Sequence, residues 1–575
     1  MEKEATLRAD FMDRCFKFRE ALVESLENPA EAERKVFRHI ISVVRNTEYA
    51  RAVGISDSPD VEEFKKRIPI SDYDGISPWL DEQASAGNSA HIVTNDTILR
   101  WLKTSGTSSK PKKIPYTSQW IFQYRVPALY AQWATYIRYC PSMLAHRFAT
   151  LDLTVSREHP KEFLSNIPFQ SITNRPHPLG SDDWCPPWHD EPWFSPDISH
   201  DYGVRTYHRL RYFLASDLRA IVAINPSNLI ALKNYLVDHL GELCSDIERG
   251  TLEGREVMGP DPGTAERLLG ICSDPDFNFR DIWPNLELIV CWTNSTARLY
   301  VHQLEKLFPG VTILPFMAVG TEGVVTIPVD DSIDAQPLAI NQGFYEFVDA
   351  DTDLGGVVGQ PLTDTLSFRE LELGKSYYLI MSQVNGMVRY LSSDVYQVAG
   401  YLGQVPLLRF SGRKGIYNSF TGEKLTEEQI IDAMAQTLSN LKMKDSLFYC
   451  CPVWSSVPYY RFLVESGDPD NGDLATLLSR SIDSTLGTRN HEYRDKRASG
   501  RLSRPDCKLV RAGAINEYYE KVVKKRAVAG QVKYNPFASS EDGLREFLTF
   551  CKVQPNNERT RMSGASEGSH ESVSA

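Results

Sequence analysis

The segment of the sequence best suited to bind phosphate is a short run of hydroxyl side chains, glycine and lysines, TSGTSSKPKK at 104–113. It begins with Thr104, Ser105, Gly106, Thr107 and Ser108 and ends with basic residues. Amides and hydroxyls in such a loop can donate hydrogen bonds to phosphate oxygens, while ammonium groups neutralise their charge. On composition alone, a solvated surface loop is an equally good interpretation, because polar loops are common.

Two acidic residues stand where a carboxylate could serve a nucleotide. Glu322 follows Thr321 in the sequence GTEG, between runs at 311–316 and 323–329 that are predicted as strands. A carboxylate at the carboxyl end of a strand in an α/β sheet is well placed to hold Mg²⁺. Asp394 ends a predicted hairpin strand, VRYLSSDV, and could bind two sugar hydroxyls. Taken singly, each is more simply an ordinary turn or surface acid.

Three basic residues and two large aromatic residues complete the candidates. Arg413 and Lys424 flank a predicted domain junction, and Lys533 lies in AGQVKYNP. A solvated side chain is the default interpretation of each. Trp292 and Phe316 precede the GTEG turn and could line an apolar pocket, although core packing is the more common role of such side chains.

Composition excludes several classes of protein. The chain has 575 residues, 42% of them hydrophobic and 24% charged, so a folded protein of more than one domain is expected. A net charge of -12 argues against binding to nucleic acid or to an anionic membrane surface. A charged N-terminus and no apolar run of spanning length predict a cytoplasmic protein. The ten cysteines lack C-x-x-C spacing, which predicts neither a disulfide framework nor a zinc site.

Helical periodicity marks the first part of the chain. Apolar residues that recur every three or four positions predict a helix with one apolar face, which Asn28-Pro29 ends. The residues of this face are Leu7, Phe11, Cys15, Phe18, Leu22 and Leu26. Residues 92–102 are predicted as a strand that leads into the 104–113 loop, and residues 227–240 as a helix.

The middle of the chain predicts two kinds of sheet. Apolar runs at 286–292 and 311–316 enclose a helical pattern at 297–308, which is typical of an α/β layer. Asn385-Gly386 between two apolar runs is a strong hairpin signal, so an antiparallel sheet is expected at about 338–410.

The character of the sequence changes near residue 412. SGRKG is a basic turn, and the residues after it predict helices alternating with strands, as in a compact α+β domain. We therefore expect a large N-terminal domain at 1–411, with α/β layers and an antiparallel β-barrel part. A small mobile α+β domain follows at 412–555, with a hinge near 412–425. Residues 556–575 are Ser-, Gly- and Glu-rich and are expected to be a disordered tail.

The order of these features resembles one family. A T-S-G-T-[ST] loop, then a [ST]-E-G turn, a strand with Asp and a late G-Q-x-K occur in that order in the acyl-acid amido synthetases of the Gretchen Hagen three family. These enzymes belong to the adenylate-forming superfamily. The resemblance runs over most of residues 30–552, including IPISDYDGISPWLDE at 68–82 and GEKLTEEQI at 422–430.

The resemblance implies a role for each candidate. Glu322 would hold Mg²⁺ and Lys533 would stabilise charge as a carboxylate attacks the α-phosphate of ATP. Trp292 and Phe316 would contact the acid. The implied nucleotide-binding residues are Thr104, Ser105, Gly106, Thr107, Ser108, Thr321, Asp394, Arg413 at the hinge, and Lys424. The chemistry would be positioning and electrostatic stabilisation, with no covalent enzyme intermediate.

The implied function is that of an ATP-dependent ligase that adenylates a carboxylic acid and transfers the acyl group to an amine or amino acid. Its expected partners are these small molecules, with ATP and Mg²⁺ as cofactors, and a monomer is expected. Two alternatives stay open. One is an acyl-CoA or other thioester-forming ligase. The other is a catalytically silent acid-binding protein on the same fold, which departures from the family pattern at Ala318, Gly320, Leu391 and Ser393 would support.

Overall fold

The chain divides into two compact units, which are described separately. The first comprises 1–415 and 527–534, and the second comprises 416–526 and 535–575. The computed structural model describes residues 2–103, 112–172, 174–175, 184–198, 202–294, 297–413, 416–418, 423, 425–453, 457–523, 534–538 and 541–551.

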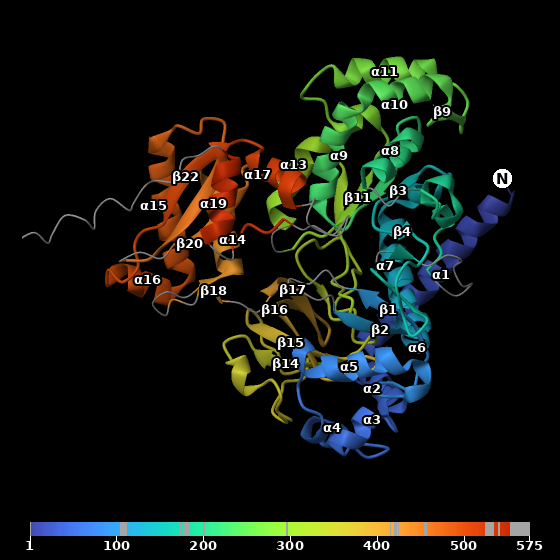
Figure 1. Cartoon of the computed structure of the whole chain (residues 1–575), viewed down its shortest axis with the longest axis vertical. Coiled ribbons are helices and arrows are strands. Elements are labelled where there is room, and N and C mark those ends of the chain that lie inside the picture. Colours follow the sequence, from blue (N-terminus) through green and yellow to red (C-terminus); the bar gives the residue numbers. More distant parts are fainter. Residues whose placement is uncertain are drawn as a thin grey trace, which may run out of the picture. The chain divides into compact units, whose positions relative to one another are not determined.

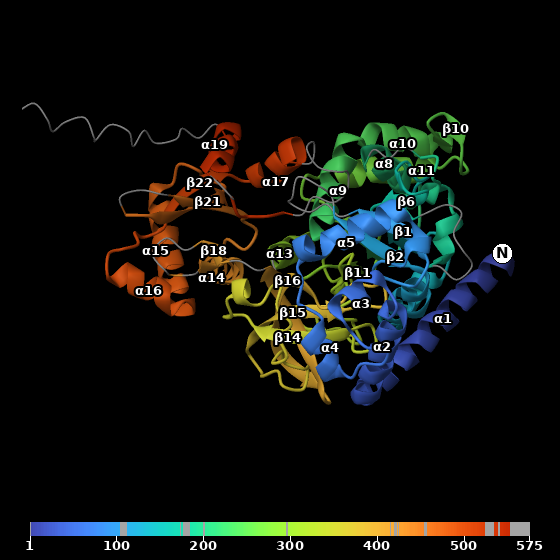
Figure 2. The ribbon, with the colours of Figure 1, turned by 60° about the horizontal axis from the view of Figure 1, so that its bottom comes forward.

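The first unit begins with two helices that meet at the predicted break. Helix α1 spans Glu2–Glu27 and α2 spans Pro29–Val44, with Pro29 in the first turn of α2, where its missing N–H costs nothing. Four of the six predicted apolar positions of α1 are buried, and Phe18 is partly buried. Leu7 lies in α1 as predicted but is 41% exposed, close to the N-terminal end of the helix, which Figure 2 marks.

Short helices and a four-stranded sheet follow. The helices are α3 (Glu48–Val53), α4 (Val61–Arg67) and α5 (Tyr73–Ala86). The sheet has the order β2-β1-β6-β5 and consists of β1 (Ile98–Lys103), β2 (Lys113–Thr117), β6 (Ile167–Gln170) and β5 (Phe163–Leu164).

The predicted strand at 92–102 is wrong in its first half, because β1 begins only at Ile98. The backbone N–H groups of Ile92 and Val93 donate to the side-chain oxygen of Gln83, at 2.7 and 3.1 Å. Gln83 is 1% exposed, so its amide replaces a neighbouring strand as the hydrogen-bond partner.

A parallel sheet forms the α/β layer of the first unit. Its order is β12-β11-β8-β3, and every neighbouring pair is parallel. The strands β3 (Thr150–Asp152), β8 (Ala220–Val222) and β11 (Leu288–Cys291) are fully buried, as expected for strands covered on both faces, and β12 spans Thr312–Pro315. Helix α13 (Arg298–Leu307) connects β11 to β12, so the predicted strand, helix and strand at 286–316 are confirmed.

Further helices gather beside this sheet (Figure 1). The predicted helix at 227–240 is confirmed as α9 (Pro226–Asp238). The others are α7 (Val126–Tyr139), α8 (Tyr202–Phe213), α10 (Leu240–Arg249), α11 (Pro262–Cys272) and α12 (Phe279–Ile282), with a π-helical segment η2 (Ile121–Arg125) directly before α7.

The predicted antiparallel sheet is confirmed. It has five strands in the order β13-β17-β16-β15-β14, namely β13 (Gln336–Pro337), β14 (Phe344–Asp349), β15 (Ser376–Ser382), β16 (Tyr390–Leu402) and β17 (Val405–Arg413). Asn385-Gly386 turns between β15 and β16 as predicted, and Gly386 has φ 93°, which favours glycine. The apolar run at 323–329 is not a regular strand; it forms only the isolated bridges Val319–Val324 and Thr326–Leu338.

The second unit is an α+β structure, as predicted for this part of the chain. Strands β20 (Phe448–Val453) and β21 (Tyr459–Ser466) pair antiparallel, and β22 (Asp506–Arg511) adds in parallel to β21. Its further elements are β18 (Ile416–Asn418), β19 (Leu425–Thr426), α14 (Glu427–Asn440), α15 (Gly472–Arg489), α16 (His491–Ala498), α17 (Ala514–Tyr518) and α19 (Glu541–Phe550).

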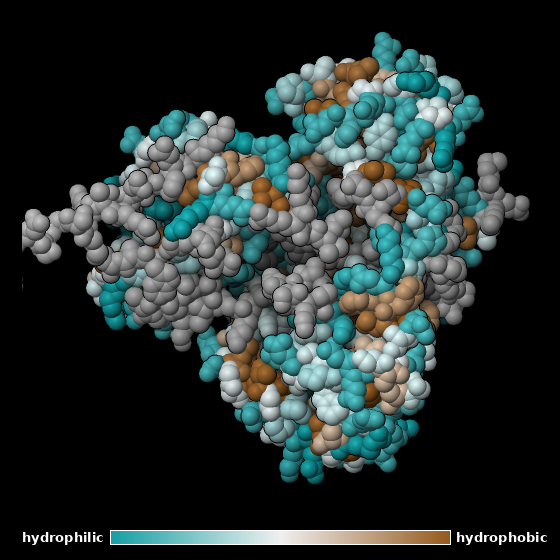
Figure 3. Space-filling model, in the orientation of Figure 1, coloured by the Kyte–Doolittle hydropathy of each residue, from teal (hydrophilic) through white to brown (hydrophobic). Residues whose placement is uncertain are grey.

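Three general properties of the described residues are the hydropathy of their surface, the state of the cysteines and the character of the helices. Hydrophilic residues predominate on the face shown in Figure 3, and hydrophobic residues form small separate groups there. All ten cysteines lie in described residues and are free thiols. Within the described ranges, no helix is both long enough and apolar enough to cross a bilayer.

Candidate active site

The GTEG turn is a compact loop closed by its own backbone. Val319 and Val324 pair as an isolated antiparallel bridge, and the N–H of Gly320 donates to the carbonyl of Gly323 at 2.9 Å. Within the turn, the Thr321 hydroxyl donates to Glu322 Oε2 at 2.8 Å. The Glu322 side chain is half-buried, and this is the one hydrogen bond of its carboxylate within the described part of the chain.

At two positions of this turn a side chain larger than that of glycine would crowd a neighbouring side chain. A Cβ atom at Gly320 would lie 2.7 Å from Glu322 Oε2, so a side chain there would displace the carboxylate. A Cβ atom at Gly323 would lie 2.8 Å from the side-chain amide of Gln383, which is fully buried. The glycine at position 320, a departure from the family pattern, is therefore compatible with the carboxylate orientation seen here.

Side chains from two distant segments hold the backbone of the turn. Arg125 Nη1 donates to the carbonyl oxygen of Gly320 at 3.0 Å, although the two residues are 195 positions apart. Asn385, buried in the β15–β16 turn, directs its amide nitrogen to the carbonyl oxygen of Glu322 at 3.5 Å. Arg125 is the last residue of the π-helix η2, a type of helix that often occurs at functional sites. Sequence analysis did not single out Arg125, because no local pattern reveals a partner so far away.

The phosphate-binding loop predicted from the sequence connects β1 to β2. Thr104, Ser105, Gly106, Thr107 and Ser108 lie outside the described residues. Both flanks are described: Lys103 pairs with Lys113 at the open end of the β1–β2 pair, so the loop leaves the sheet between them.

The lysines at these flanks have different surroundings. Lys103 forms an ion pair with Glu162 at 2.7 Å, and Lys113 forms one with Asp81 at 2.6 Å. Lys112 instead lies over the ring of Tyr73 at 5.0 Å, with its Nζ 3.4 Å from the hydroxyl of Tyr390. Lys113 of this run and Lys103 directly before it are therefore each paired with a carboxylate.

Tyr73 links this flank electrostatically to the GTEG turn. Its hydroxyl accepts a hydrogen bond from the backbone N–H of Lys113 at 2.7 Å. Burial raises the pKa of Tyr73, and the charges of Asp81, Asp74 and Glu322 add to the increase. Glu322 thus lies within electrostatic reach of the residues that end the loop, although the two motifs are about two hundred residues apart in the chain.

Asp394 and Arg413 lie opposite each other on the neighbouring strands β16 and β17, and the sequence did not predict this pairing. The expectation that Asp394 ends its strand is wrong, because β16 continues to Leu402. The polar residues Ser392 and Ser393 resemble a strand end, yet β17 supplies a partner along this stretch, and Asp394 pairs with Arg413. The N–H of Asp394 donates to the Ser392 hydroxyl at 3.2 Å, and Ser393 has φ 63°.

The two candidate aromatic residues lie at neighbouring strand ends. Trp292 directly follows β11 and Phe316 directly follows β12, and the N–H of Phe316 donates to the carbonyl of Cys291 at 2.9 Å. The Trp292 ring is half-buried and packs on Phe410 at 5.7 Å, while Phe316 is 9% exposed. Phe316 is therefore part of the core and Trp292 packs against the core, at the edge of the sheet where ligands of α/β proteins bind.

A buried carboxylate lies at the same edge and was not predicted. Asp152 ends β3 and is 1% exposed. It accepts hydrogen bonds from the N–H and hydroxyl of Thr154, at 2.8 and 2.5 Å, and from the indole of Trp188 at 3.2 Å. Burial raises the pKa of Asp152, and these bonds partly offset the effect. The sequence feature that could have revealed Asp152 is its position as a charged residue at the end of the strand segment ATLD.

Other predicted residues have no described side chain. Lys424 and Lys533 lie outside the described residues, and only the backbone of Arg413 is described. Among the described side chains, no group of three or more His, Cys, Asp or Glu could hold a metal ion alone. Mg²⁺ commonly binds through one or two carboxylates, with water and substrate phosphates completing its shell, and the half-buried Glu322 beside a glycine-lined turn fits that pattern.

Comparison with known proteins identifies three domains in order. The sequence model of the GH3 family N-terminal domain matches residues 18–313, that of the GH3 family central domain matches 336–413, and that of the GH3 family C-terminal domain matches 428–542. Together they match more than half of the chain.

Similar curated proteins carry related names. The chain is 26% identical to a probable indole-3-acetic acid-amido synthetase, GH3.7 of Oryza sativa subsp. japonica, over 71% of this chain and 72% of that protein. It is 24% identical to indole-3-acetic acid-amido synthetase GH3.17 of Arabidopsis thaliana, over 74% of this chain and 76% of that protein.

Solved structures support the fold. A structure described as AtGH3.15 acyl acid amido synthetase in complex with 2,4-DB matches with a TM-score of 0.77 and 18% identity, covering 94% of this chain and 96% of that chain. A second GH3.15 acyl acid amido synthetase structure matches with a TM-score of 0.75 and 19% identity, covering 93% and 95%.

Proposed function

The chain belongs to the GH3 family, and on that premise we propose how it works. It is an amido synthetase that activates a carboxylic acid with ATP and joins the acyl group to an amine. The observation that carries this conclusion is the match of all three GH3 domains, in order, along the chain. The resemblance inferred from the ordered motifs is thereby confirmed at the level of the family.

The proposed reaction has two balanced half-reactions. First, a carboxylate oxygen of the acid bonds to the α-phosphorus of ATP, and the bond to the bridging oxygen breaks, so that pyrophosphate leaves with the electron pair. Second, the nitrogen of the amine bonds to the acyl carbon, the bond to the AMP oxygen breaks, and the amine loses a proton. Separating the two steps keeps the reactive acyl-adenylate from water.

We assign the nucleotide to the region around the GTEG turn. The loop residues 104–108 would donate hydrogen bonds to phosphate oxygens, Thr321 would support them, and Asp394 would accept bonds from the ribose hydroxyls. Glu322 would hold Mg²⁺, whose charge offsets that of the phosphates. The electrostatic reach of Glu322 to Tyr73, beside the loop flank, supports this grouping.

We further propose that the small domain moves between the half-reactions. The division of the chain at residue 415 falls beside Arg413, the proposed hinge residue, and precedes Lys424. In this proposal Lys424 lies beside the nucleotide in one arrangement and Lys533 stabilises the charge that develops during adenylation. The domain limits 1–411 and 412–555, with the tail 556–575, belong to the same proposal.

For substrates we propose an apolar carboxylic acid and an amino acid or small amine. In this proposal the half-buried ring of Trp292 offers apolar surface to the acid, and Phe316, which is 9% exposed, supports it from the neighbouring strand end. The curated relatives named above act on indole-3-acetic acid by their names, which makes that acid a first choice for testing. The cytoplasmic location and monomeric state expected from the sequence stay predictions.

The test is ATP consumption with a panel of carboxylic acids, each with and without amino acids or simple amines. AMP and pyrophosphate are separated chromatographically from ADP and phosphate. We expect AMP together with an amide. AMP that appears only when CoA is added would favour a thioester-forming ligase. Nucleotide binding without AMP from any acid would favour a silent binding protein.

Two substitutions connect this assay to the site. Glu322→Ala and Lys533→Ala should each abolish AMP formation while leaving the thermal unfolding transition in place. Gln is also tested at position 322, because it preserves the shape of the side chain and removes only its charge. Wild-type rates in Glu322→Ala or Lys533→Ala would refute the assignment of that residue.

A further inference from the structure

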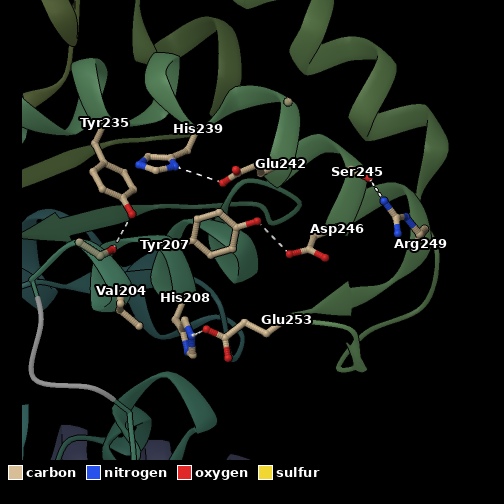
Figure 4. A pocket seen from close by; sticks show the side chains of 12 residues that line it. Val204, Tyr207, His208, Tyr235, His239, Glu242, Ser245, Asp246, Arg249 and Glu253 are labelled. Atoms are coloured by element: carbon tan, nitrogen blue, oxygen red, sulfur yellow. Dashed lines mark hydrogen bonds and ion pairs between the residues drawn. The ribbon is translucent and has the colours of Figure 1, made fainter.

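A cavity of about 820 Å³ that is widely open to solvent lies among helices α8, α9 and α10 in the first unit. Figure 4 shows the side chains that converge on it. Its volume falls within the range of roughly 300–1,000 Å³ that is typical of small-molecule sites. Its lining residues all belong to 203–253, so none is part of the proposed nucleotide site. The reaction described above assigns this cavity no role.

Aromatic rings form one wall of the cavity. Tyr235 and His239 lie one helical turn apart, with ring centroids 4.3 Å from each other, and the ring of Tyr207 stands edge-on at 6.1 Å from His239. The Tyr235 hydroxyl donates to the carbonyl of Gly203 at 2.6 Å, which fixes its ring. A wall of aromatic faces provides apolar contact and attracts positive charge.

Charged groups around the rings are predominantly acidic. Glu242, Asp246 and Glu253 line the cavity, and Arg249 is the one Lys or Arg among its lining residues. Tyr207 donates to Asp246 at 2.8 Å, as Figure 4 shows. The Glu242 side chain is 74% exposed and that of Glu253 is 62% exposed, so these carboxylates face the solvent that a ligand would displace.

The remaining titratable groups do not reverse this balance. His239 lies 3.2 Å from Glu242, and His208 lies 3.2 Å from Glu253. Arg211 is buried and is not among the lining residues, and its Nε donates to the carbonyl of Thr251. An inorganic cation has no ligand set here, because no three metal-binding side chains come together among the described residues.

We propose that this cavity binds a small organic cation. An ammonium group would face Asp246 and Glu242 on α10, and the apolar body of the molecule would lie against Tyr207 and Tyr235. Aromatic faces beside carboxylates are the usual recognition chemistry for such ions. This proposal does not depend on the adenylation reaction, since binding is expected without ATP or an acid.

The test is calorimetric titration of the full chain with benzylamine, in the absence of ATP and carboxylic acid and at constant ionic strength. Benzyl alcohol is the neutral ligand of similar shape. Asp246→Asn removes a charge from the cavity and keeps one acceptor oxygen, where Asp246 accepts from both Tyr207 and Thr251. Glu248→Gln is the matched control, because Glu248 is an exposed acid on the same helix that does not line the cavity.

We expect saturable binding of benzylamine, about fivefold weaker binding by Asp246→Asn, unchanged binding by Glu248→Gln and much weaker binding of benzyl alcohol. If Asp246→Asn does not fold, Glu242→Gln replaces it, since the Glu242 side chain is 74% exposed. Equal affinity for amine and alcohol, equal affinity in all variants, or no binding by the wild-type protein would each overturn the proposal.

Discussion

Replacing Arg125 by Met should weaken the use of ATP more than it weakens the fold. Met fills a similar volume but cannot donate to the carbonyl oxygen of Gly320, which the guanidinium reaches at 3.0 Å. A hydrogen bond from a charged group contributes about 1.5–3 kcal/mol. Because each 1.36 kcal/mol corresponds to tenfold in rate, complete loss of this support in the transition state would lower kcat/KM for ATP by roughly 10- to 150-fold.

The assay is AMP release at varied ATP concentration with the acid and amine held saturating. Arg280→Met is the control, since Arg280 also donates to a backbone carbonyl, that of Leu286 at 3.3 Å, but lies in α12. It should lower the melting temperature without changing the dependence on ATP. Arg125→Lys should recover part of the lost rate. An unchanged kcat/KM for ATP in Arg125→Met, or the same loss in Arg280→Met, would refute the positioning role.

Three further changes test the packing around the site and in the second unit. Gly323→Ala should lower both the melting temperature and the rate of AMP formation, because its Cβ would lie 2.8 Å from the buried Gln383 amide. Gly270→Ala is the control: no atom lies within 4 Å of its Cβ, so it should lower neither quantity. Arg389→Met should lower the free energy of unfolding by about 3–5 kcal/mol, since it leaves Glu346, 1% exposed, as an unpaired buried charge. A loss of less than about 1 kcal/mol by calorimetry, the size measured for exposed ion pairs, would contradict this. Burial raises the pKa of Glu465, so its contribution to stability is full below the unfolded pKa and is lost as pH rises through the folded pKa. As pH rises from 4 to 8, the melting temperature of Glu465→Gln should therefore increase relative to that of the wild-type protein. A difference between the two melting temperatures that stays constant over this range would contradict the prediction.

Local signals predicted the fold where neighbouring residues determine it. The strand, helix and strand at 286–316 and the Asn385-Gly386 turn follow from short apolar runs and from turn chemistry, and both are confirmed. The errors arise where a distant group intervenes. Gln83 takes the hydrogen bonds of residues 92 and 93, and β17 extends β16 past Asp394.

The candidate site was predictable in part for the same reason. The order of the motifs pointed to the GTEG turn and Asp394 as candidates, because their carboxylate side chains are visible in the sequence itself. Arg125 and Asn385 act on backbone carbonyls of the turn, and a carbonyl carries no sequence signature. Sequence composition likewise could not reveal the aromatic and acidic cavity, whose side chains come from three helices and a loop.

Transfer of an oxygen label tests the central claim most directly. The protein is incubated with ATP, an amine and a carboxylic acid labelled with ¹⁸O in both carboxylate oxygens, and the AMP is analysed by mass spectrometry. Attack of the carboxylate on the α-phosphorus predicts that the AMP carries one ¹⁸O atom and the amide keeps the other. Unlabelled AMP, or label in inorganic phosphate with ADP as the nucleotide product, would contradict acyl-adenylate formation.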